Sequence, residues 1–204
     1  LSVERLDYTY LNMMIGNDNN LNKKTIAIIG AGSLGSYVSR ELSKCGVKNF
    51  IIADSDSYSS ENYMRHTFPL FYKNSNKALL QKLDLERLHP EVHVKACRQN
   101  ISRENLLEEM GDADLIIFTI GNSDTQLELN HFFREKNIQI PTIFAWLEAG
   151  GESSHVFFTS HNSQGCYQCL HTDANGDFCD NKINVAQEVD PSEHLIRNGC
   201  GGVR

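Results

Sequence analysis

The sequence lacks the features of a fibre, a membrane protein or a nucleic-acid-binding protein. Proline is scarce, with 4 residues in a chain of 204, and a composition of 40% hydrophobic and 22% charged residues excludes disorder and fibrous repeats. The most apolar runs, 115–120 and 140–147, fall far short of the roughly 20 residues that a spanning helix needs. Basic residues number 19 against 26 acidic ones, so the net charge of −7 makes nucleic acid and anionic membranes unexpected partners.

An apolar leader and an extracellular disulfide pattern are also missing. Glu4, Arg5 and Asp7 interrupt any apolar segment at the visible N-terminus, so no signal peptide is expected. Of the 6 cysteines, Cys45 and Cys97 stand alone, and the others lie beyond residue 165. Such clustering without a secretory signal favours metal binding or thiol chemistry over disulfides. We therefore expect a reducing, cytoplasmic compartment.

Apolar runs of strand length and helix length alternate through the middle of the chain. We expect strands at 25–30, 50–54, 92–97, 115–121, 142–147 and 155–160, and helices at 34–45, 78–88, 102–110 and 123–136. Ser123, with Gln126 three residues later, has the form of a capping box and is expected to start the last helix. This alternation predicts an α/β fold, in which helices cover both faces of a mostly parallel sheet.

The same pattern divides the chain into three segments. Residues 1–22 are polar and rich in asparagine, which predicts an N-terminal extension that ends in a loop. Residues 23–160 hold the alternating strands and helices. Residues 161–204 lose this alternation and form an irregular, cysteine-containing segment.

Three glycines follow the first predicted strand. Gly30, Gly32 and Gly35 form a G-x-G-x-x-G motif that opens a predicted helix. Glycines let the backbone approach an oxyanion, and a helix N-terminus offers N–H groups and a positive dipole end. Asp54 ends the second strand, where an acidic side chain can bind ribose hydroxyls. These residues predict a Rossmann-like site that suits NAD as well as ATP, with a tight turn without ligand as the alternative.

The residues beyond Asp54 favour a triphosphate. Asp56, Asn62, Arg65 and Lys77 follow it in order. A nicotinamide cofactor has little need for Arg65 and Lys77, whereas a triphosphate suits a guanidinium fork and an ammonium. Solvated charges on a loop and at a helix start are the alternative.

A further carboxylate, Asp124, follows the strand predicted at 115–121. Open α/β sheets bind their ligands at the carboxyl ends of strands, where a carboxylate can hold Mg²⁺ against phosphates. Alternatively, Asp124 only helps to cap the helix that begins beside it.

The cysteines near the C-terminal end divide into a pair and two single residues. Cys166 and Cys169 have the spacing of half a tetrahedral zinc site, because two intervening residues let both thiolates reach one Zn²⁺. Cys179 and Cys200 could complete it, although their spacings are less economical. A thioredoxin-like redox role is disfavoured because the pair does not precede a helix in a βαβ unit.

Cys200 also has the features of a nucleophile. Its neighbours Gly199, Gly201 and Gly202 leave the thiol open to a bulky acyl group. A structural or ligand cysteine is the alternative.

Together these motifs resemble the adenylation domain of ubiquitin-activating enzymes and of their bacterial ThiF and MoeB relatives, over roughly residues 24–204. The resemblance rests on the glycine motif, the D-x-D-x(5)-N-x-x-R run that starts at Asp54, Lys77, Asp124 and the C-x-x-C pair. The segments 62–66, 146–151 and 165–170 look like the activating domains of bacterial antiphage CBASS operons. Those domains are often fused or paired with a conjugating enzyme and a JAB-type peptidase.

The resemblance implies an enzyme that uses ATP and Mg²⁺ to adenylate the C-terminal carboxylate of a ubiquitin-like or other protein. Asp54 would then bind the ribose, and Asp124 the magnesium. The side chains implied at the phosphates are those of Asn62, Arg65 and Lys77. An adenylyltransferase for sulfur carrier proteins of the thiamine or molybdopterin type, an NAD-dependent oxidoreductase and a non-catalytic binding subunit are the alternatives.

The resemblance also implies later steps and partners. Cys200 would accept the acyl group as a thioester and pass it to a conjugating enzyme. A homodimer is implied, with Arg5 as a candidate to reach the ATP of the partner, and so is a zinc site completed by a second C-x-x-C pair beyond Arg204. One departure is that Glu128 and Leu129 stand where many relatives have an arginine.

Overall fold

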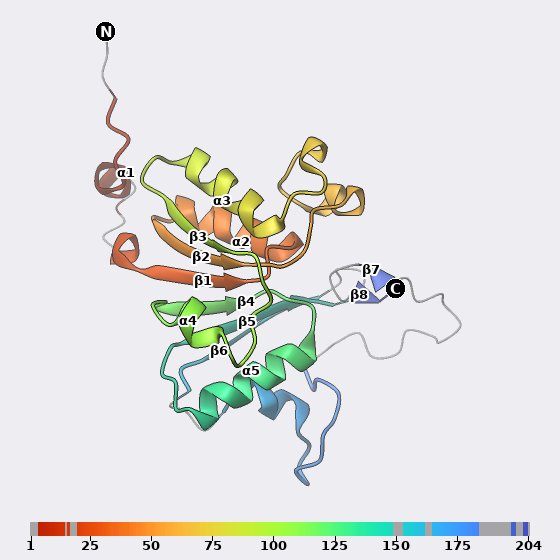
Figure 1. Cartoon of the computed structure of the whole chain (residues 1–204). Helices are drawn as coiled ribbons and strands as arrows, with labels where there is room; N and C mark the ends of the chain where they lie inside the picture. Colours follow the sequence, from red (N-terminus) through yellow and green to blue (C-terminus); the bar gives the residue numbers. More distant parts are fainter. Residues whose placement is uncertain are drawn as a thin grey trace.

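The computed structural model describes residues 4–14, 16, 20–148, 153–161, 165–183, 197–198 and 202–203. Six strands form one sheet in the order β3-β2-β1-β4-β5-β6 (Figure 1). They are β1 (Thr25–Ile29), β2 (Asn49–Ala53), β3 (His93–Cys97), β4 (Leu115–Phe118), β5 (Thr142–Leu147) and β6 (Ser154–Thr159). Neighbouring strands from β3 to β5 are parallel, and β6 runs antiparallel to β5. The predicted α/β class with a mostly parallel sheet is confirmed.

Helical segments and one short strand pair complete the described residues. The α-helices are α1 (Tyr8–Met14), α2 (Ser33–Lys44), α3 (Lys77–Leu88), α4 (Leu106–Met110) and α5 (Ser123–Glu135). The 3₁₀ helices are η1 (Asn20–Lys23), η2 (Ser60–Arg65), η3 (Leu70–Tyr72) and η5 (Tyr167–His171). Strands β7 (Arg197–Asn198) and β8 (Gly202–Val203) pair with each other. None of the helices in the described ranges is both long and apolar enough to cross a membrane.

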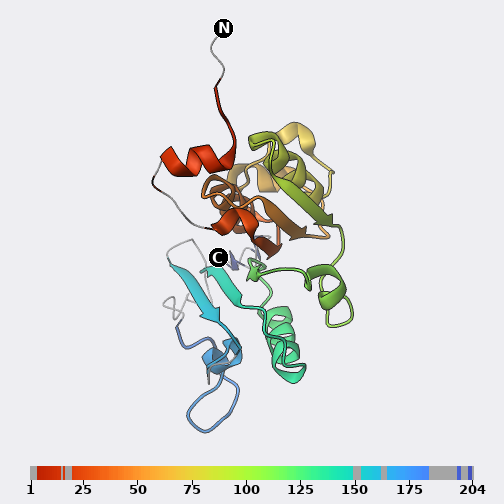
Figure 2. The same ribbon diagram turned by 90° about the vertical axis from the view of Figure 1, so that its left-hand side faces the viewer.

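Helices cover both faces of the sheet, as predicted (Figures 1 and 2). On one face, Leu85 of α3 packs in a cluster with Ile28 of β1. On the other face, Leu106 of α4 and Phe133 of α5 pack in a second cluster with Phe118 of β4. Because both faces are buried, the central strands are continuous apolar runs rather than alternating ones.

The strand order places the carboxyl ends of β1 and β4 side by side, at the point in the sheet where the direction of the chain connections reverses. From β1 the chain continues to β2 and β3 on one side, and then crosses back to β4 on the other side. Open α/β sheets leave a crevice at such a switch point, because the flanking helices run in opposite directions from it. The fold therefore predicts a ligand site between the segments that follow β1, β2 and β4.

Several local predictions are corrected by the structure. The N-cap of α5 is Asn122, whose Oδ1 accepts a hydrogen bond from the N–H of Thr125 at 3.0 Å, so Ser123 is the first helical residue rather than the cap. Residues 102–105 form a turn before α4 instead of its first part, because Asn105 Oδ1 accepts from the N–H of Ser102 at 2.8 Å.

The N-terminal extension contains helix α1, which the polar composition of residues 1–22 did not predict. Tyr8 is 4% exposed and packs in the same cluster as Ile28. Its hydroxyl donates to the carbonyl oxygen of Ser43 at 2.7 Å. One aromatic residue thus joins the extension to α2.

Candidate nucleotide-binding site

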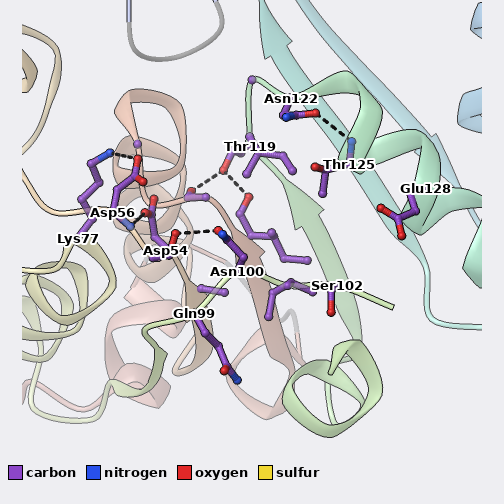
Figure 3. Close-up of a pocket in the computed structure, with 18 residues that line it drawn as sticks. Asp54, Asp56, Lys77, Gln99, Asn100, Ser102, Thr119, Asn122, Thr125 and Glu128 are labelled. Carbon is purple, nitrogen blue, oxygen red and sulfur yellow. Dashed lines mark hydrogen bonds and ion pairs between the residues drawn. The ribbon is translucent and has the colours of Figure 1, made fainter. Parts of the chain in front are cut away.

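A cavity of about 430 Å³ opens at the carboxyl ends of β1, β2, β3 and β4. Figure 3 shows Asp54, Asp56 and Lys77 on one side of it and Asn122, Thr125 and Glu128 on the other. The other described residues that line it are Ile29, Gly30, Gly32, Ala53, Ser55, Gln99, Asn100, Ile101, Ser102, Thr119, Ile120 and Gly121. This position is the switch point of the sheet.

The glycine motif forms the turn between β1 and α2. Gly30 has φ +104°, and a Cβ there would lie 2.8 Å from Ile120 Cγ2. A Cβ on Gly35 would lie 1.9 Å from the carbonyl oxygen of Gly30, so α2 could not approach the turn this closely with a side chain at 35. Gly32 is the N-cap of α2 and lines the cavity. The motif therefore brings a helix N-terminus to the cavity, where N–H groups and the dipole favour an anion.

Asp54 lies directly after β2 and is already tied to the glycine turn. Its Oδ2 accepts from the N–H of Ala31 at 2.8 Å, and its Oδ1 accepts from the N–H of Asp56 at 2.8 Å. Burial raises the pKa of the Asp54 carboxyl, although the nearby Lys77 ammonium and these hydrogen bonds oppose the shift. Each oxygen keeps a free lone pair that a ribose hydroxyl could use.

Lys77 and Asp56 form an ion pair on the same side of the cavity. Lys77 Nζ lies 2.8 Å from Asp56 Oδ2, and the Lys77 side chain is 7% exposed. Lys77 is the first residue of α3, whose N-cap Asn76 also donates from Nδ2 to the carbonyl oxygen of Asp54 at 2.8 Å. The structure thus brings Asp54, Asp56 and Lys77 together on one side of the cavity.

Asn62 and Arg65 lie on η2 and are not among the described residues that line the cavity. Asn62 is buried, and its Oδ1 accepts from the N–H of Ser59 at 3.1 Å, which closes a capping box on η2. Arg65 is half-buried at the end of the same helix. In this structure the Asn62 side chain therefore stabilises the start of η2, and none of the described residues of η2 lines the cavity.

Asp124 is exposed in the first turn of α5 and is likewise absent from the described lining. Its neighbours Asn122, Thr125 and Glu128 do line the cavity. The carboxylates that face the cavity are thus those of Asp54, Asp56 and Glu128, which are hard oxygen ligands of the kind that Mg²⁺ prefers.

Sequence reasoning missed the loop after β3. Gln99, Asn100 and Ser102 line the cavity, and Asn100 Oδ1 accepts from Ser55 Oγ at 2.7 Å. The rule that ligands bind beyond strand carboxyl ends applies to β3 as well, and it was the available signal.

Cys166 and Cys169 meet away from this cavity, where η5 packs against α5. Their Sγ atoms are 3.8 Å apart. Two thiolates that bind the same tetrahedral Zn²⁺ at about 2.3 Å are separated by about this distance. Burial opposes ionisation of Cys166, but the neighbouring Asn130 side chain, the Cys169 thiol and nearby backbone N–H groups outweigh it and lower the pKa of the Cys166 thiol. The pair suits half of a zinc site, although no group of three or more metal-binding side chains occurs in the part of the chain that the structure describes. Cys200 lies outside the described residues.

Comparison with known proteins gives consistent matches. The sequence profile described as the ThiF family matches residues 10–196. The ATP-dependent ubiquitin transferase-like protein Cap2 of Pseudomonas aeruginosa is 30% identical over 212 residues, covering 100% of this chain and 36% of that protein. The sulfur carrier protein ThiS adenylyltransferase of Escherichia coli is 28% identical over 149 residues, covering 72% of this chain and 58% of that protein.

Solved structures show the same fold. The crystal structure of E. coli MccB with ATP has a TM-score of 0.66 and 22% identity, and the match covers 73% of this chain and 45% of MccB. The chain thus spans between about a third and three-fifths of the length of these relatives.

Proposed function

Because the chain belongs to the ThiF family, we propose that it adenylates the C-terminal carboxylate of a ubiquitin-like or other protein, with ATP as the second substrate. The observation that carries the proposal is the cavity at the switch point. It combines a glycine turn at a helix N-terminus, a ribose-type carboxylate in Asp54 and a buried ammonium in Lys77. This set of groups suits a nucleotide triphosphate better than a nicotinamide cofactor.

The proposed binding mode assigns each group to one part of ATP. The N–H of Gly32, at the N-terminus of α2, and the ammonium of Lys77 bind phosphates, and Asp54 accepts from the ribose. Arg65 and Asn62 join the phosphates from η2, which requires that this segment close over the bound nucleotide. Mg²⁺, which would neutralise phosphate charge, is assigned to Asp124, with Glu128 as the carboxylate of α5 that already lines the cavity.

The proposed reaction needs positioning more than acid–base chemistry. The substrate carboxylate, already ionised at neutral pH, attacks the α-phosphorus of ATP. A new carboxylate oxygen–phosphorus bond forms, and the bond to the β-phosphate oxygen breaks, which releases pyrophosphate. The chain contributes by holding the two reactants in line and by placing positive groups where negative charge develops.

The second proposed step transfers the acyl group to Cys200 as a thioester, which releases AMP, and then to a conjugating enzyme. The likeness to Cap2, a ubiquitin transferase-like protein, supports this route. The likeness to the ThiS adenylyltransferase favours a second candidate, in which the adenylated substrate is a sulfur carrier protein.

Two further assemblies belong to the proposal. Zinc bound by Cys166 and Cys169 would join η5 to the residues that complete the site.

The protein would act as a homodimer in which Arg5, exposed and paired at 3.0 Å with Asp7, leaves Asp7 to reach the ATP bound by the neighbouring protomer. Sedimentation under active conditions tests the dimer, since the mass of a single protomer would contradict it.

The experiment that tests the function is ATP–pyrophosphate exchange. We expect labelled pyrophosphate to enter ATP only when the full-length protein, Mg²⁺ and a candidate ubiquitin-like substrate are all present. A substrate that lacks its last residue is the matched control and should give no exchange. Thermal stabilisation by NAD but not by ATP and Mg²⁺ would contradict the proposal and favour an oxidoreductase.

A further inference from the structure

His66 is a buried histidine directly after η2, and none of the roles above uses it. The residue is 7% exposed. Its ring lies 4.2 Å from the Phe68 ring and 5.4 Å from the Tyr58 ring, measured between centroids. A polar ring in such a setting must satisfy both of its nitrogens within the protein.

Both nitrogens of His66 have backbone partners, and these partners define the tautomer. The N–H of Thr67 lies 3.0 Å from Nδ1, and an N–H can only donate, so Nδ1 is the acceptor. Nε2 lies 2.8 Å from the carbonyl oxygen of Ala31, which can only accept, so Nε2 carries the proton. The ring must be neutral for both bonds to exist. Burial lowers the pKa of His66 to about 4 and keeps the ring neutral at pH 7; the hydrogen bond to Ala31 opposes this shift, and the charges of Lys77 and Arg65 add to it.

Ala31 is the middle residue of the glycine turn, and side chains from two distant segments hold its two polar groups. Its N–H donates to Asp54 Oδ2 at 2.8 Å, and its carbonyl accepts from His66. The neighbouring carbonyl of Gly30 accepts from Thr119 Oγ1 at 2.6 Å. Both carbonyl oxygens of the turn are therefore bound to protein donors and are kept from facing an incoming phosphate, which they would repel.

Holding the Ala31 carbonyl also orients the next N–H. The carbonyl of Ala31 and the N–H of Gly32 belong to one planar trans peptide, in which they point in opposite directions. Gly32 lines the cavity, as the N-cap of α2. A donor at the His66 position thus controls the direction of an N–H group at the proposed phosphate site.

We propose that His66 is a positioning residue, which holds the Ala31–Gly32 peptide in the orientation that lets the glycine turn bind the nucleotide phosphates. The inference rests on the proposed function for the identity of the ligand. It goes beyond that function by assigning the shape of the turn to a side chain located 35 residues farther along the chain.

Two amide variants separate this role from simple packing. Glutamine places its amide nitrogen near the position of Nε2 and retains a donor to Ala31. Asparagine is shorter, retains a polar group near Nδ1 for Thr67 and cannot reach Ala31. Both lose the aromatic ring, so the loss of ring packing is common to His66→Gln and His66→Asn. Tyr58→Phe, which removes the 2.8 Å hydrogen bond to the carbonyl oxygen of Phe68, perturbs the same aromatic cluster without touching the turn.

The measurements are ATP affinity at saturating Mg²⁺ and amide hydrogen exchange of residues 29–35 without nucleotide, on the full-length protein. We expect His66→Asn to weaken ATP binding about tenfold, the factor for one lost buried hydrogen bond, and to speed exchange in the turn. His66→Gln should stay within about threefold of wild type in affinity, since it keeps that bond, and Tyr58→Phe should leave both measurements unchanged. Equal losses in the Gln and Asn variants, or wild-type behaviour of His66→Asn, would overturn the proposal.

A measurement on the unmodified protein covers the case in which a variant does not fold. Imidazole ¹⁵N–¹H correlation spectra at pH 7 should show His66 protonated at Nε2 only, and protonation at Nδ1 would overturn the proposal. A wild-type protein that binds no ATP would contradict the proposed function, whereas the exchange data without nucleotide would still decide whether His66 holds the turn.

Discussion

Lys77 Nζ lies 2.8 Å from Asp56 Oδ2, and the two side chains differ sharply in exposure, with 7% of the lysine accessible against 65% of the aspartate. A buried ammonium is thus paired with a carboxylate that can move into solvent. Rotation of Asp56 costs little because its carboxylate can be hydrated. Such a pair can release its lysine to a stronger anion, and an incoming phosphate group is one.

The first prediction concerns this lysine. Lys77→Met should weaken ATP binding by about a hundredfold, since a charge-assisted hydrogen bond to phosphate in a buried position contributes about 1.5–3 kcal/mol. Stability should change little, because the remaining Asp56 is exposed. Equilibrium binding and thermal unfolding measure the two effects. Lys82→Met, on the same helix and 39% exposed at its side chain, is the matched control, and an equal loss there would refute a specific role of Lys77.

The second prediction tests the magnesium ligand. Asp124→Ala should abolish pyrophosphate exchange at saturating Mg²⁺ while circular dichroism stays unchanged, if this carboxylate turns inward when ATP binds. Glu128→Ala is the informative comparison, because Glu128 already lines the cavity. Loss of exchange in Glu128→Ala alone would transfer the magnesium role to that residue. Asp112→Ala, an exposed acid beyond α4, should be neutral.

The third prediction concerns the cysteine pair. Replacement of Cys166 and Cys169 by serine should remove bound zinc and lower the unfolding temperature more than it lowers ATP affinity, because the pair lies at the η5–α5 contact and not at the cavity. Metal analysis and thermal unfolding of the full-length protein are the measurements. Cys45→Ser, at an exposed site, is the control. A wild-type preparation free of zinc would contradict the assignment.

The fourth prediction separates the two proposed steps. Cys200→Ala should keep ATP–pyrophosphate exchange, since the carboxylate reacts with ATP before any thiol is needed, and should abolish transfer to the conjugating enzyme. The second readout is an adduct that a reducing agent removes. If Cys200 is a zinc ligand instead, both activities should fall together with the metal content. Adduct formation that persists in the variant would point to another cysteine, and Cys179→Ala would test the first alternative.

The fifth prediction is a pH dependence of stability. Burial lowers the pKa of folded His66 to about 4 from an unfolded value of 6.5, so the unfolded chain binds more protons between these values. The stability contributed by neutral His66 is therefore complete above pH 6.5 and is lost as the pH falls toward 4. Relative to His66→Gln, which does not titrate, wild type should lose about 3 kcal/mol of unfolding free energy across this window. Urea unfolding at several pH values measures it, and parallel curves for the two proteins would contradict it.

Much of the fold follows from local patterns in the sequence. Continuous apolar runs such as Thr25–Ile29 predict buried parallel strands, because side chains of one run must fill both faces of a covered sheet. The glycine motif and Asp54 were expected to lie close together, since their backbone requirements and their places after strands are encoded within a few residues, and the structure joins them by the hydrogen bond from Ala31 to Asp54. Helix boundaries were less predictable, because Ser123 and Asn122 are both good caps and only the backbone path selects Asn122.

The tertiary structure alone decided several contacts between residues far apart in the sequence. The order of the strands brings the loop after β3, with Gln99 and Asn100, to the same cavity as the start of α5. It also brings His66 to Ala31 and leaves Asp124 exposed beside Glu128. Sequence periodicity is local information, which specifies on which face of a helix or strand a residue lies. Contacts between residues far apart depend on how the crossovers place whole elements, and no local pattern carries that information.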